Sequence, residues 1–360
     1  MNVVLDTIED WIKRGDRVAV ATVVDTKKSA PQPPGTKMGI NELGEVVGAV
    51  SGGCVEGAVV EVAERIIDGA APQLLHYGIA DDDAWDVGLP CGGEISVWVQ
   101  NHIAGEAQAR FAQLAQSGAR AALVTVVEDS RATGARMLVL PGGDPDGTLG
   151  DAGLDEAAVG FAREALWTER SELHEVGESK LFVDVVAPPP RLFVVGAVDF
   201  AAQLCEVAKI AGWRPFVIDP RARFATTARF PAAERVIVAW PEEGFGQLDP
   251  IDPATAIAVL THDPKLDDAA LRAALSSEAF YIGAMGSRRA QARRRERLLA
   301  AGLDAELLDR VAAPIGLDLG ALTAAETALS IMSEIVALRH GRAGGRLIEA
   351  RGRIHDVVPA

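Results

Sequence analysis

Hydrophobic and polar positions up to about residue 105 follow a pattern that predicts several short strands and one helix. Residues 17–25 read RVAVATVVD, and a β-branched apolar run of this kind is typical of a buried strand. Weaker strand patterns follow at 37–40, 45–50, 73–77 and 94–99. Apolar residues three and four positions apart over 55–67 predict a helix that ends near Gly69.

A similar pattern returns in the next stretch of the chain. AALVTVVE at 121–128 resembles AVATVVD at 19–25, and a later GARM segment resembles an earlier GTKM segment. These matches predict an internal duplication, with one copy over about 1–105 and a degenerate copy over about 106–187. The alternative is two similar units that arose from common strand and helix patterning.

The APPP run at 187–190 is a stiff break in the chain. We place the domain boundary there, with an α+β N-terminal domain over 1–187 and a second domain over 188–360. Beyond the break, strands are predicted at 192–196, 215–219, 235–239, 256–261 and 280–283, and helices at 200–211, 267–275, 288–301 and 323–341. This alternation predicts an α/β fold class in which the C-terminal domain is a Rossmann-like, doubly wound sheet.

Composition then narrows the function classes. The chain has 360 residues, of which 49% are hydrophobic, so it can bury a large core. Its formal net charge of −16 argues against a nucleic-acid partner and against an anionic membrane surface. We find no apolar run of the roughly 18 residues that a membrane span needs, and no signal peptide. Three widely spaced cysteines argue against a disulfide framework and favour a reducing, cytoplasmic location.

Two of the cysteines lie in glycine-rich turns. Cys54 follows Gly52 and Gly53, and Cys91 precedes Gly92. Glycine permits tight turns and close approach by another molecule, so this setting favours thiols that are presented to a ligand. The alternative is a buried cysteine that fills a tight turn.

Cys54 also comes directly before the helix predicted over 55–67. Amide dipoles at a helix start favour the thiolate form of a cysteine, and Glu56 would oppose this effect modestly. The third cysteine, Cys205, has apolar spacing within a predicted helix, so we expect it in the core.

The first turn of the predicted parallel sheet matches the dinucleotide-binding fingerprint weakly. The fingerprint reads GxGxxG, but only Gly196 is present, and Val198 stands where the backbone should approach a pyrophosphate. Asp219 ends the next strand, at the position of an acid that would bind a ribose. We therefore expect that NAD(P) is not a cofactor, and keep an NAD(P)-dependent oxidoreductase as an alternative.

A better phosphate site follows the last of these strands. Gly283 and Gly286 precede Ser287 and Arg288, which begin a helix rich in arginine. Backbone amides at a helix start attract anions, and the hydroxyl and guanidinium groups add donors. The alternative is a plain N-cap on a helix with a solvated basic face.

Together these segments resemble the XdhC/CoxI family of accessory factors, which mature molybdenum hydroxylases such as xanthine dehydrogenase and carbon monoxide dehydrogenase. In the first domain the resemblance rests on SGGCVEG at 51–57 and GLPCGGE at 88–94. In the second domain it rests on FVVGAVDFAAQL, THDPKLD, YIGAMGSRR and PIGLDLG. One departure is that many members read GAGHV where this chain has GAVDF at 196–200.

The resemblance implies a non-catalytic chaperone that binds the molybdenum cofactor and delivers it to an apo molybdenum hydroxylase. It also implies that a cysteine desulfurase adds a sulfido ligand while the cofactor is held. The molybdopterin could be the mononucleotide or the dinucleotide form. Cys54 and Cys91 would supply thiolate contacts to molybdenum, and we expect a homodimer. A thiol redox protein that uses Cys54 and Cys91 is a further alternative.

Overall fold

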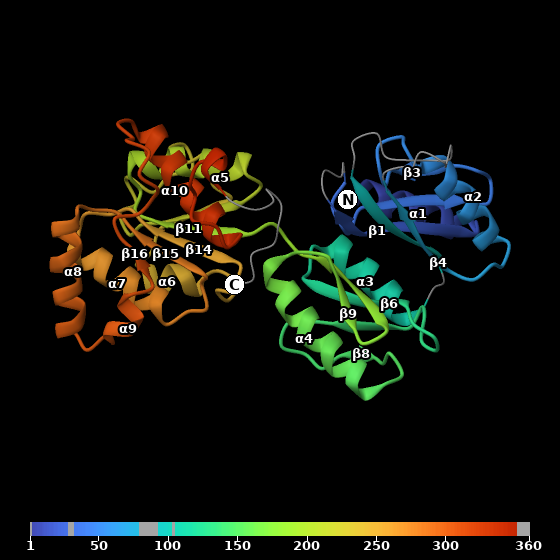
Figure 1. The fold of residues 1–360 in the computed structure, drawn as a ribbon. Helices are drawn as coiled ribbons and strands as arrows, with labels where there is room; N and C mark the ends of the chain where they lie inside the picture. The colour runs from blue at the N-terminus through green and yellow to red at the C-terminus, as the bar shows by residue number, and fades with distance from the viewer. Residues whose placement is uncertain (1, 28–31, 79–92, 103–104, 351–360) are drawn as a thin grey trace. The chain divides into compact units, whose positions relative to one another are not determined.

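The structure, a computed structural model, describes residues 2–27, 32–78, 93–102 and 105–350. The chain divides into two compact units, Met1–Pro188 and Pro189–Ala360 (Figure 1). The division lies inside the proline run at 187–190, where stiff backbone separates two kinds of sheet. Among the described residues, no helix has the length and apolar character that a membrane crossing needs.

The first half of the N-terminal unit is an antiparallel sheet in the order β3-β2-β1-β5-β4. Its strands are β1 (Val18–Lys27), β2 (Lys37–Asn41), β3 (Val46–Gly48), β4 (Gln73–Tyr77) and β5 (Glu94–Asn101). Helix α2 (Glu56–Ile67) buries its apolar stripe on one face of this sheet. Helix α1 (Asn2–Arg14) packs Ile8 and Trp11 against the other face of β1.

The second half of this unit is an antiparallel sheet in the order β8-β7-β6-β10-β9, the same arrangement as the first. Its strands are β6 (Ala121–Glu128), β7 (Arg136–Val139), β8 (Asp146–Gly147), β9 (Glu172–Val176) and β10 (Ser179–Val186). Helix α4 (Ala152–Thr168) covers one face, and helix α3 (Glu106–Ser117) packs Phe111 on the other. Each sheet therefore has a helix on each face.

The two sheets contact each other through matched positions. A shared buried cluster takes two residues from each sheet: Val24, Trp98, Val127 and Phe182. Beside it, Lys37 Nζ donates to Asp184 Oδ2 at 2.6 Å, and each side chain is only 7% exposed. Arg136 Nη2 donates to Gln100 Oε1 at 2.5 Å in the opposite direction, from the second sheet to the first. Polar pairs and apolar packing thus join the two halves into one unit.

The C-terminal unit is built on a six-stranded, all-parallel sheet in the order β13-β12-β11-β14-β15-β16. Its strands are β11 (Arg191–Val195), β12 (Arg214–Ile218), β13 (Arg235–Ile237), β14 (Thr255–Val259), β15 (Tyr281–Ala284) and β16 (Val311–Ala312). This strand order is that of a doubly wound, dinucleotide-binding sheet. The predicted fold class, a Rossmann-like domain preceded by an α+β domain, is confirmed.

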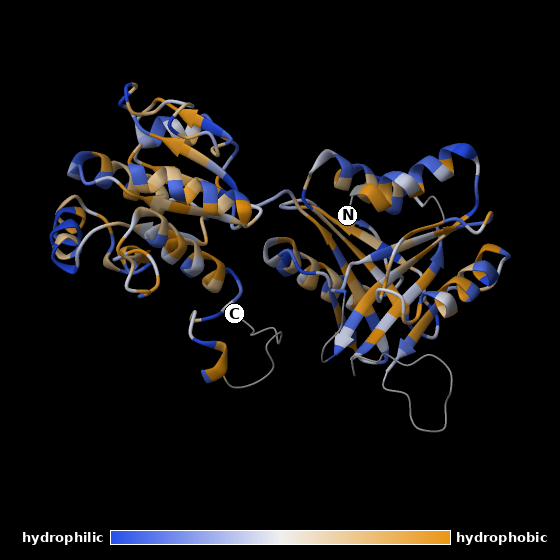
Figure 2. Cartoon of the chain, turned by 90° about the horizontal axis from the view of Figure 1, so that it is seen from above, coloured by the Kyte–Doolittle hydropathy of each residue, from blue (hydrophilic) through white to orange (hydrophobic). Residues whose placement is uncertain are grey.

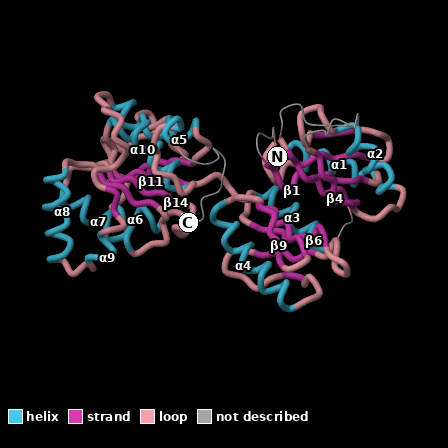
Figure 3. Tube along the Cα trace, viewed as in Figure 1, coloured by secondary structure: helices cyan, strands magenta, loops and turns pink. Residues whose placement is uncertain are grey.

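Helices cover both faces of the parallel sheet (Figure 3). One face carries α5 (Asp199–Ile210) and α10 (Ala324–Arg339). The other carries α6 (Pro241–Gly246), α7 (Pro264–Leu275), α8 (Arg288–Ala300) and α9 (Ala305–Leu308). Hydrophobic and hydrophilic positions alternate along the helices (Figure 2). A short 3-10 helix, Leu347–Glu349, follows α10.

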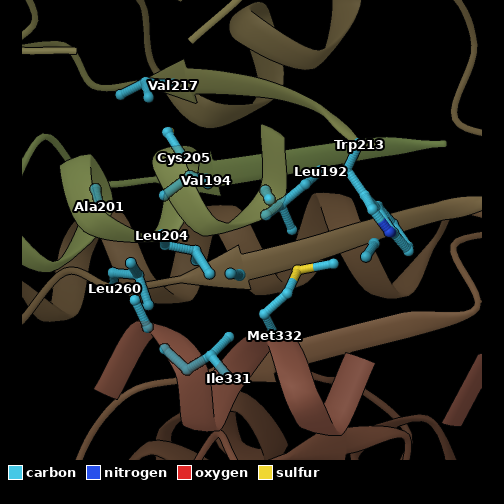
Figure 4. Packing of buried hydrophobic residues seen from close by; sticks show 14 of the residues in the cluster. Leu192, Val194, Ala201, Leu204, Cys205, Trp213, Val217, Leu260, Ile331 and Met332 are labelled. Atoms are coloured by element: carbon cyan, nitrogen blue, oxygen red, sulfur yellow. The ribbon is translucent and has the colours of Figure 1, made fainter. Parts of the chain in front are cut away.

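Cys205 belongs to the core between α5 and the parallel sheet (Figure 4). Its side chain is fully buried, and burial raises the pKa of its thiol to about 12. The prediction that Cys205 is a core residue is confirmed, and its thiol stays protonated at neutral pH.

Candidate functional site

A glycine-rich loop joins β3 to α2 and carries Cys54. Gly52 has a φ of 91° and Gly53 a φ of 118°, which residues with side chains rarely adopt. A Cβ at either position would meet no atom of the described residues within 4 Å. The positive φ values therefore require both glycines, and no described residue fills the space beside them.

The Glu56 carboxylate holds this loop from inside. Five backbone N–H groups donate to it at 2.8–3.2 Å, those of Val50, Ser51, Gly52, Gly53 and Val55. The Ser51 hydroxyl donates a sixth hydrogen bond at 2.6 Å. Burial would raise the pKa of Glu56, but the hydrogen bonds from Ser51 and Gly52 outweigh it and lower the pKa from 4.5 to about 2. Glu56 is therefore a carboxylate anion at neutral pH.

Cys54 lies between the residues that Glu56 holds. Its N–H donates to Ser51 Oγ at 3.0 Å, and its free thiol group is partly buried against the core beneath α2. Helix α2 begins at Glu56, and Val55 offers no side-chain cap. The Glu56 carboxylate takes N–H groups of the loop that precedes the helix. Glu56 organises the loop through these hydrogen bonds, and its modest opposition to a Cys54 thiolate stays a prediction.

The register of the first sheet places this loop at the end where β5 begins. Gly48 ends β3 opposite Met38, and the direction of β3 carries residues 49–54 toward the end of β1. Glu94 begins β5 opposite Lys27, the last residue of β1. The second cysteine motif precedes Glu94, but Cys91 and Gly92 lie outside the described residues. Their part in a site stays a prediction.

A metal site made wholly by the chain would need several ligands close together. Among the described residues, no three His, Cys, Asp or Glu side chains come together as such a site would require. Within the part of the chain that the structure describes, Cys54 therefore offers a metal one thiol group.

Residues predicted for a site in the second unit gather at the carboxyl edge of the parallel sheet. Gly196 follows β11, Asp219 follows β12, and Gly286 and Ser287 follow β15. Strands β12 and β13 are added on one side of β11, and strands β14 to β16 on the other, so the direction of strand order changes between β11 and β14. Ligands of doubly wound sheets bind outside the carboxyl ends of the strands at such a switch point.

Gly196 is required by close packing at this edge. Its φ is 114°, and a Cβ here would lie 2.9 Å from Thr261 Cγ2 and 3.1 Å from Thr261 N. Val198 is the N-cap of α5 and makes no side-chain cap hydrogen bond. The turn thus has the backbone of a Rossmann first turn, with a side chain where the second glycine of the fingerprint would stand.

Asp219 is fully buried and bound on both oxygens. Oδ1 accepts from Arg221 N and Nε, and Oδ2 accepts from Ala197 N and Arg221 Nη2, all at 2.6–2.9 Å. Burial would raise the pKa of Asp219, but hydrogen bonds from Arg221 and Ala197 outweigh it and lower the pKa. Asp219 therefore holds the first turn and Arg221 in place, and its oxygens have no capacity left for a ribose.

The start of α8 is organised differently. Ser287 is its N-cap and accepts from Ala290 N at 3.2 Å, while Gly286 has a φ of 137°. The N–H groups of Gly286, Ser287 and Arg288 have no partner among the described residues, so no internal carboxylate fills this turn. Gly283 serves packing, because a Cβ there would lie 2.5 Å from Ile315 Cδ1.

The buried Arg294 side chain fixes the backbone of this turn through a hydrogen bond to Met285 O. It is 4% exposed, and its Nη2 donates to Met285 O and to Asp267 Oδ2, each at 2.8 Å. Asp267 also accepts from the Thr261 hydroxyl at 2.5 Å. Because C=O and N–H of a trans peptide point in opposite directions, holding Met285 O turns the Gly286 N–H away from Arg294. Sequence reasoning missed Arg294, because a run of arginines is typical of a solvated face.

The exposed arginines of α8 fall into two groups. Arg295 and Arg297 pair with Asp309 and Asp268, each at 2.8 Å. Three others have no partner among the described residues: Arg288, Arg289 and Arg293. Two of these three lie in the first turn, so unpaired positive charge adjoins the open N–H groups.

Known protein families match both units. A family model described as "XdhC Rossmann domain" matches residues 192–335. Another, described as "XdhC and CoxI family", matches residues 11–78 and 114–177, one stretch in each half of the first unit.

Individual proteins are similar over most of the chain. A Bacillus subtilis (strain 168) protein, named as a probable subunit of xanthine dehydrogenase, is 27% identical over 329 residues, 90% of this chain and 94% of that protein. The Escherichia coli (strain K12) protein named "Molybdenum cofactor insertion chaperone PaoD" is 27% identical over 326 residues, 90% of this chain and 84% of that protein. A Bacillus halodurans crystal structure, described as a xanthine dehydrogenase, has a TM-score of 0.62 at 24% identity, covers 96% and 98% of the two chains, and shows a shared fold.

Proposed function

Because the chain belongs to the XdhC and CoxI family, we propose that it binds the molybdenum cofactor and delivers it to an apo molybdenum hydroxylase. Support comes from the similar E. coli protein, which is named as a molybdenum cofactor insertion chaperone. The B. subtilis relative is named after xanthine dehydrogenase, a molybdenum hydroxylase. The proposed role is that of a chaperone and not of an enzyme.

The Cys54 loop is the observation that carries this proposal. Cys54 is a free thiol beside two glycines, and no atom of the described residues lies within 4 Å of where their Cβ atoms would be. Thiolate is a soft ligand that suits a metal carrying sulfur ligands of its own. A single thiol can hold such a metal loosely enough for transfer, whereas a closed four-ligand site would retain it. Cys91 is proposed as a second contact.

The start of α8 is proposed to bind the phosphate of the pterin. Two other glycine turns are filled by carboxylates of the chain, Glu56 at α2 and Asp219 beside α5. The turn at Gly286 keeps its N–H groups unpartnered among the described residues and has Arg288 beside it. Amide donors and a guanidinium together recognise a phosphate, whether the cofactor is the mononucleotide or the dinucleotide form.

NAD(P) is not proposed as a cofactor. Asp219 has both carboxylate oxygens engaged by Ala197 and Arg221, so the usual ribose contact is missing. Val198 adds a side chain at the turn that a pyrophosphate would approach. An NAD(P)-dependent oxidoreductase would have to bind NADH, which a titration of the purified chain measures directly.

The partners follow from the proposed role. A delivery protein must meet the apo hydroxylase, and a cysteine desulfurase could act on the cofactor while it is held. We also propose a homodimer and a cytoplasmic location, where the thiols of Cys54 and Cys91 stay reduced.

The direct experiment purifies the protein from a molybdate-fed host and analyses it for molybdenum and pterin by mass spectrometry. We expect bound pterin and molybdenum, which then pass to a cofactor-free molybdenum hydroxylase on mixing and restore its activity. A protein that carries neither pterin nor molybdenum, and restores no activity, would contradict the proposal. Loss of free thiols under mild oxidant with no bound pterin would favour a thiol redox protein.

The phosphate contact is tested by Arg288→Glu. An acidic residue suits a helix start, so the apo-protein should melt no lower than the wild type. Binding of inorganic pyrophosphate should weaken roughly tenfold or more, because a charged hydrogen bond is lost. Arg293→Glu, one turn further along α8, is the matched control and should bind nearly as the wild type does. Equal binding by all three proteins would exclude this helix start as the phosphate site.

A further inference from the structure

The backbone of the Cys54 loop depends on the Glu56 side chain. Every N–H group from Val50 to Val55 donates to Glu56 or to Ser51 Oγ, and the Ser51 hydroxyl itself donates to Glu56. Six consecutive amides therefore point inward, toward one carboxylate and the hydroxyl bound to it. Such convergence fixes the backbone on both sides of Cys54.

We infer that Glu56 is the positioning residue of the Cys54 thiol, holding the loop in the open, glycine-dependent turn from which that thiol meets its ligand. The inference rests on the proposed function, since it assigns Cys54 the task of contacting the cofactor. Glu56 acts through the backbone and does not touch the cargo.

Side-chain length matters to this role. Glu56 is the first residue of α2, and its chain reaches back over the loop to residues as far as Val50. Aspartate, shorter by one methylene, would keep the charge but could not reach all of these N–H groups. Glutamine would keep the length but replace one acceptor oxygen with a donor, which cannot accept from an N–H group. The two substitutions therefore separate the effect of side-chain length from the effect of the negative charge.

The second half of the unit shows what the shorter acid does. Asp155 stands at the position that corresponds to Glu56, eight residues after the glycine that ends the paired strand. It accepts only from Leu149 N and from the Thr148 hydroxyl among the described residues, each at 2.7 Å. There the helix begins earlier, at Ala152, with Asp151 as its N-cap. In this half the acid binds fewer groups of the loop, and the residues that correspond to the end of the Cys54 loop are part of the helix.

The experiment measures alkylation of Cys54 by iodoacetamide in the cofactor-free full chain, followed at this residue by peptide mass spectrometry. Loss of hydrogen bonds to residue 56 lets the loop unfold locally and exposes the partly buried Cys54 sulfur. The thiol in Glu56→Asp and in Glu56→Gln should therefore be alkylated faster, by roughly tenfold to a hundredfold. Glu64→Asp, an exposed glutamate on the same helix, is the matched control and should keep the wild-type rate.

The pair of variants distinguishes the outcomes. Acceleration in Glu56→Gln alone would mean that Glu56 acts by its charge, which would overturn the positioning role. Wild-type rates in both variants would also overturn it. A cooperative melt of each variant shows that the fold persists. The alkylation experiment uses cofactor-free protein, so its result does not depend on the proposed function. The proposed function fails only if the wild-type chain carries no molybdenum or pterin.

Discussion

The two halves of the N-terminal unit share a strand order but differ in the loop that leads into their second helix. In the first half, residues 51–55 form an open turn with two left-handed glycines and a free thiol. In the second half, the corresponding residues 150–154 hold Asp151, an N-cap that accepts from Gly153 N and Leu154 N. The first loop is organised around the Glu56 carboxylate, whereas the second caps the start of its helix.

The contacts between the halves show what the second half provides. Lys37 and Arg136 occupy matched positions, each opposite a threonine of the central strand of its sheet. Each reaches across to the other sheet, where Asp184 accepts from Lys37 and Gln100 accepts from Arg136. This reciprocity is what a duplicated unit that packs on itself would produce. The second half thus contributes one acceptor, Asp184, and one donor, Arg136, to the contact between the sheets.

The largest expected effect comes from breaking the buried ion pair. Asp184→Ala would leave the Lys37 ammonium group buried without its carboxylate, which should lower the free energy of unfolding by about 3–5 kcal/mol. Gln100→Ala removes the neutral acceptor at the matched position and should lower it by about 1–2 kcal/mol. Urea denaturation of both variants makes the comparison. Equal losses would mean that the two cross-sheet pairs are energetically equivalent.

A smaller change in stability should distinguish a glycine of the Cys54 loop, Gly53, from a glycine within helix α2, Gly57, when each is replaced by alanine. Gly53→Ala places a side chain at a φ of 118° and should destabilise the fold by about 1–3 kcal/mol. Gly57→Ala, four residues later in α2, would place its Cβ within 4 Å of no described atom and should stabilise the fold by up to about 1 kcal/mol. Thermal melts would show opposite shifts. Shifts of the same sign would refute the claim that the turn requires Gly53.

The smallest expected effect is the pH dependence that Glu56 contributes to stability. The folded pKa of Glu56 is about 2, below the ordinary 4.5, so its stabilisation is complete above about pH 4.5 and is lost as pH falls toward 2. Allowing for partial solvent screening, Glu56→Gln should remove about 1–2 kcal/mol at pH 7. The difference from the wild type should shrink as pH falls below 4.5. A difference that stays constant from about pH 7 to about pH 3 would argue against an ionised Glu56.

Strands and helices were largely predictable because their periodicity is local. The apolar run at 17–25 became β1, and the pattern over 55–67 became α2, which begins at Glu56. The strand expected over 45–50 is shorter, Val46–Gly48, because Gly48 has a φ of 78° and the chain turns there. The parallel sheet followed from alternating buried strands and helices.

The interior of the site was not predictable from local pattern. Glu56 is one acidic residue on an amphipathic helix, and nothing in its spacing shows that its carboxylate turns back to collect N–H groups. Asp219 stands where a ribose-binding acid is expected, yet the chain itself occupies both oxygens. Arg294 has the spacing of a solvated arginine, but it is buried against Asp267. Each role depends on contacts between residues that only folding brings together.

The central claim is that the Cys54 loop holds the molybdenum cofactor, and metal analysis of matched cysteine variants tests it most directly. Wild type, Cys54→Ser and Cys205→Ala would be purified side by side from a molybdate-fed host, and their molybdenum and pterin contents measured per chain. Cys205 is buried in the core of the other unit, so its variant controls for the loss of a thiol. We predict that Cys54→Ser loses most of the bound molybdenum while Cys205→Ala retains it. Equal molybdenum in Cys54→Ser and the wild type, with both folded, would contradict the account.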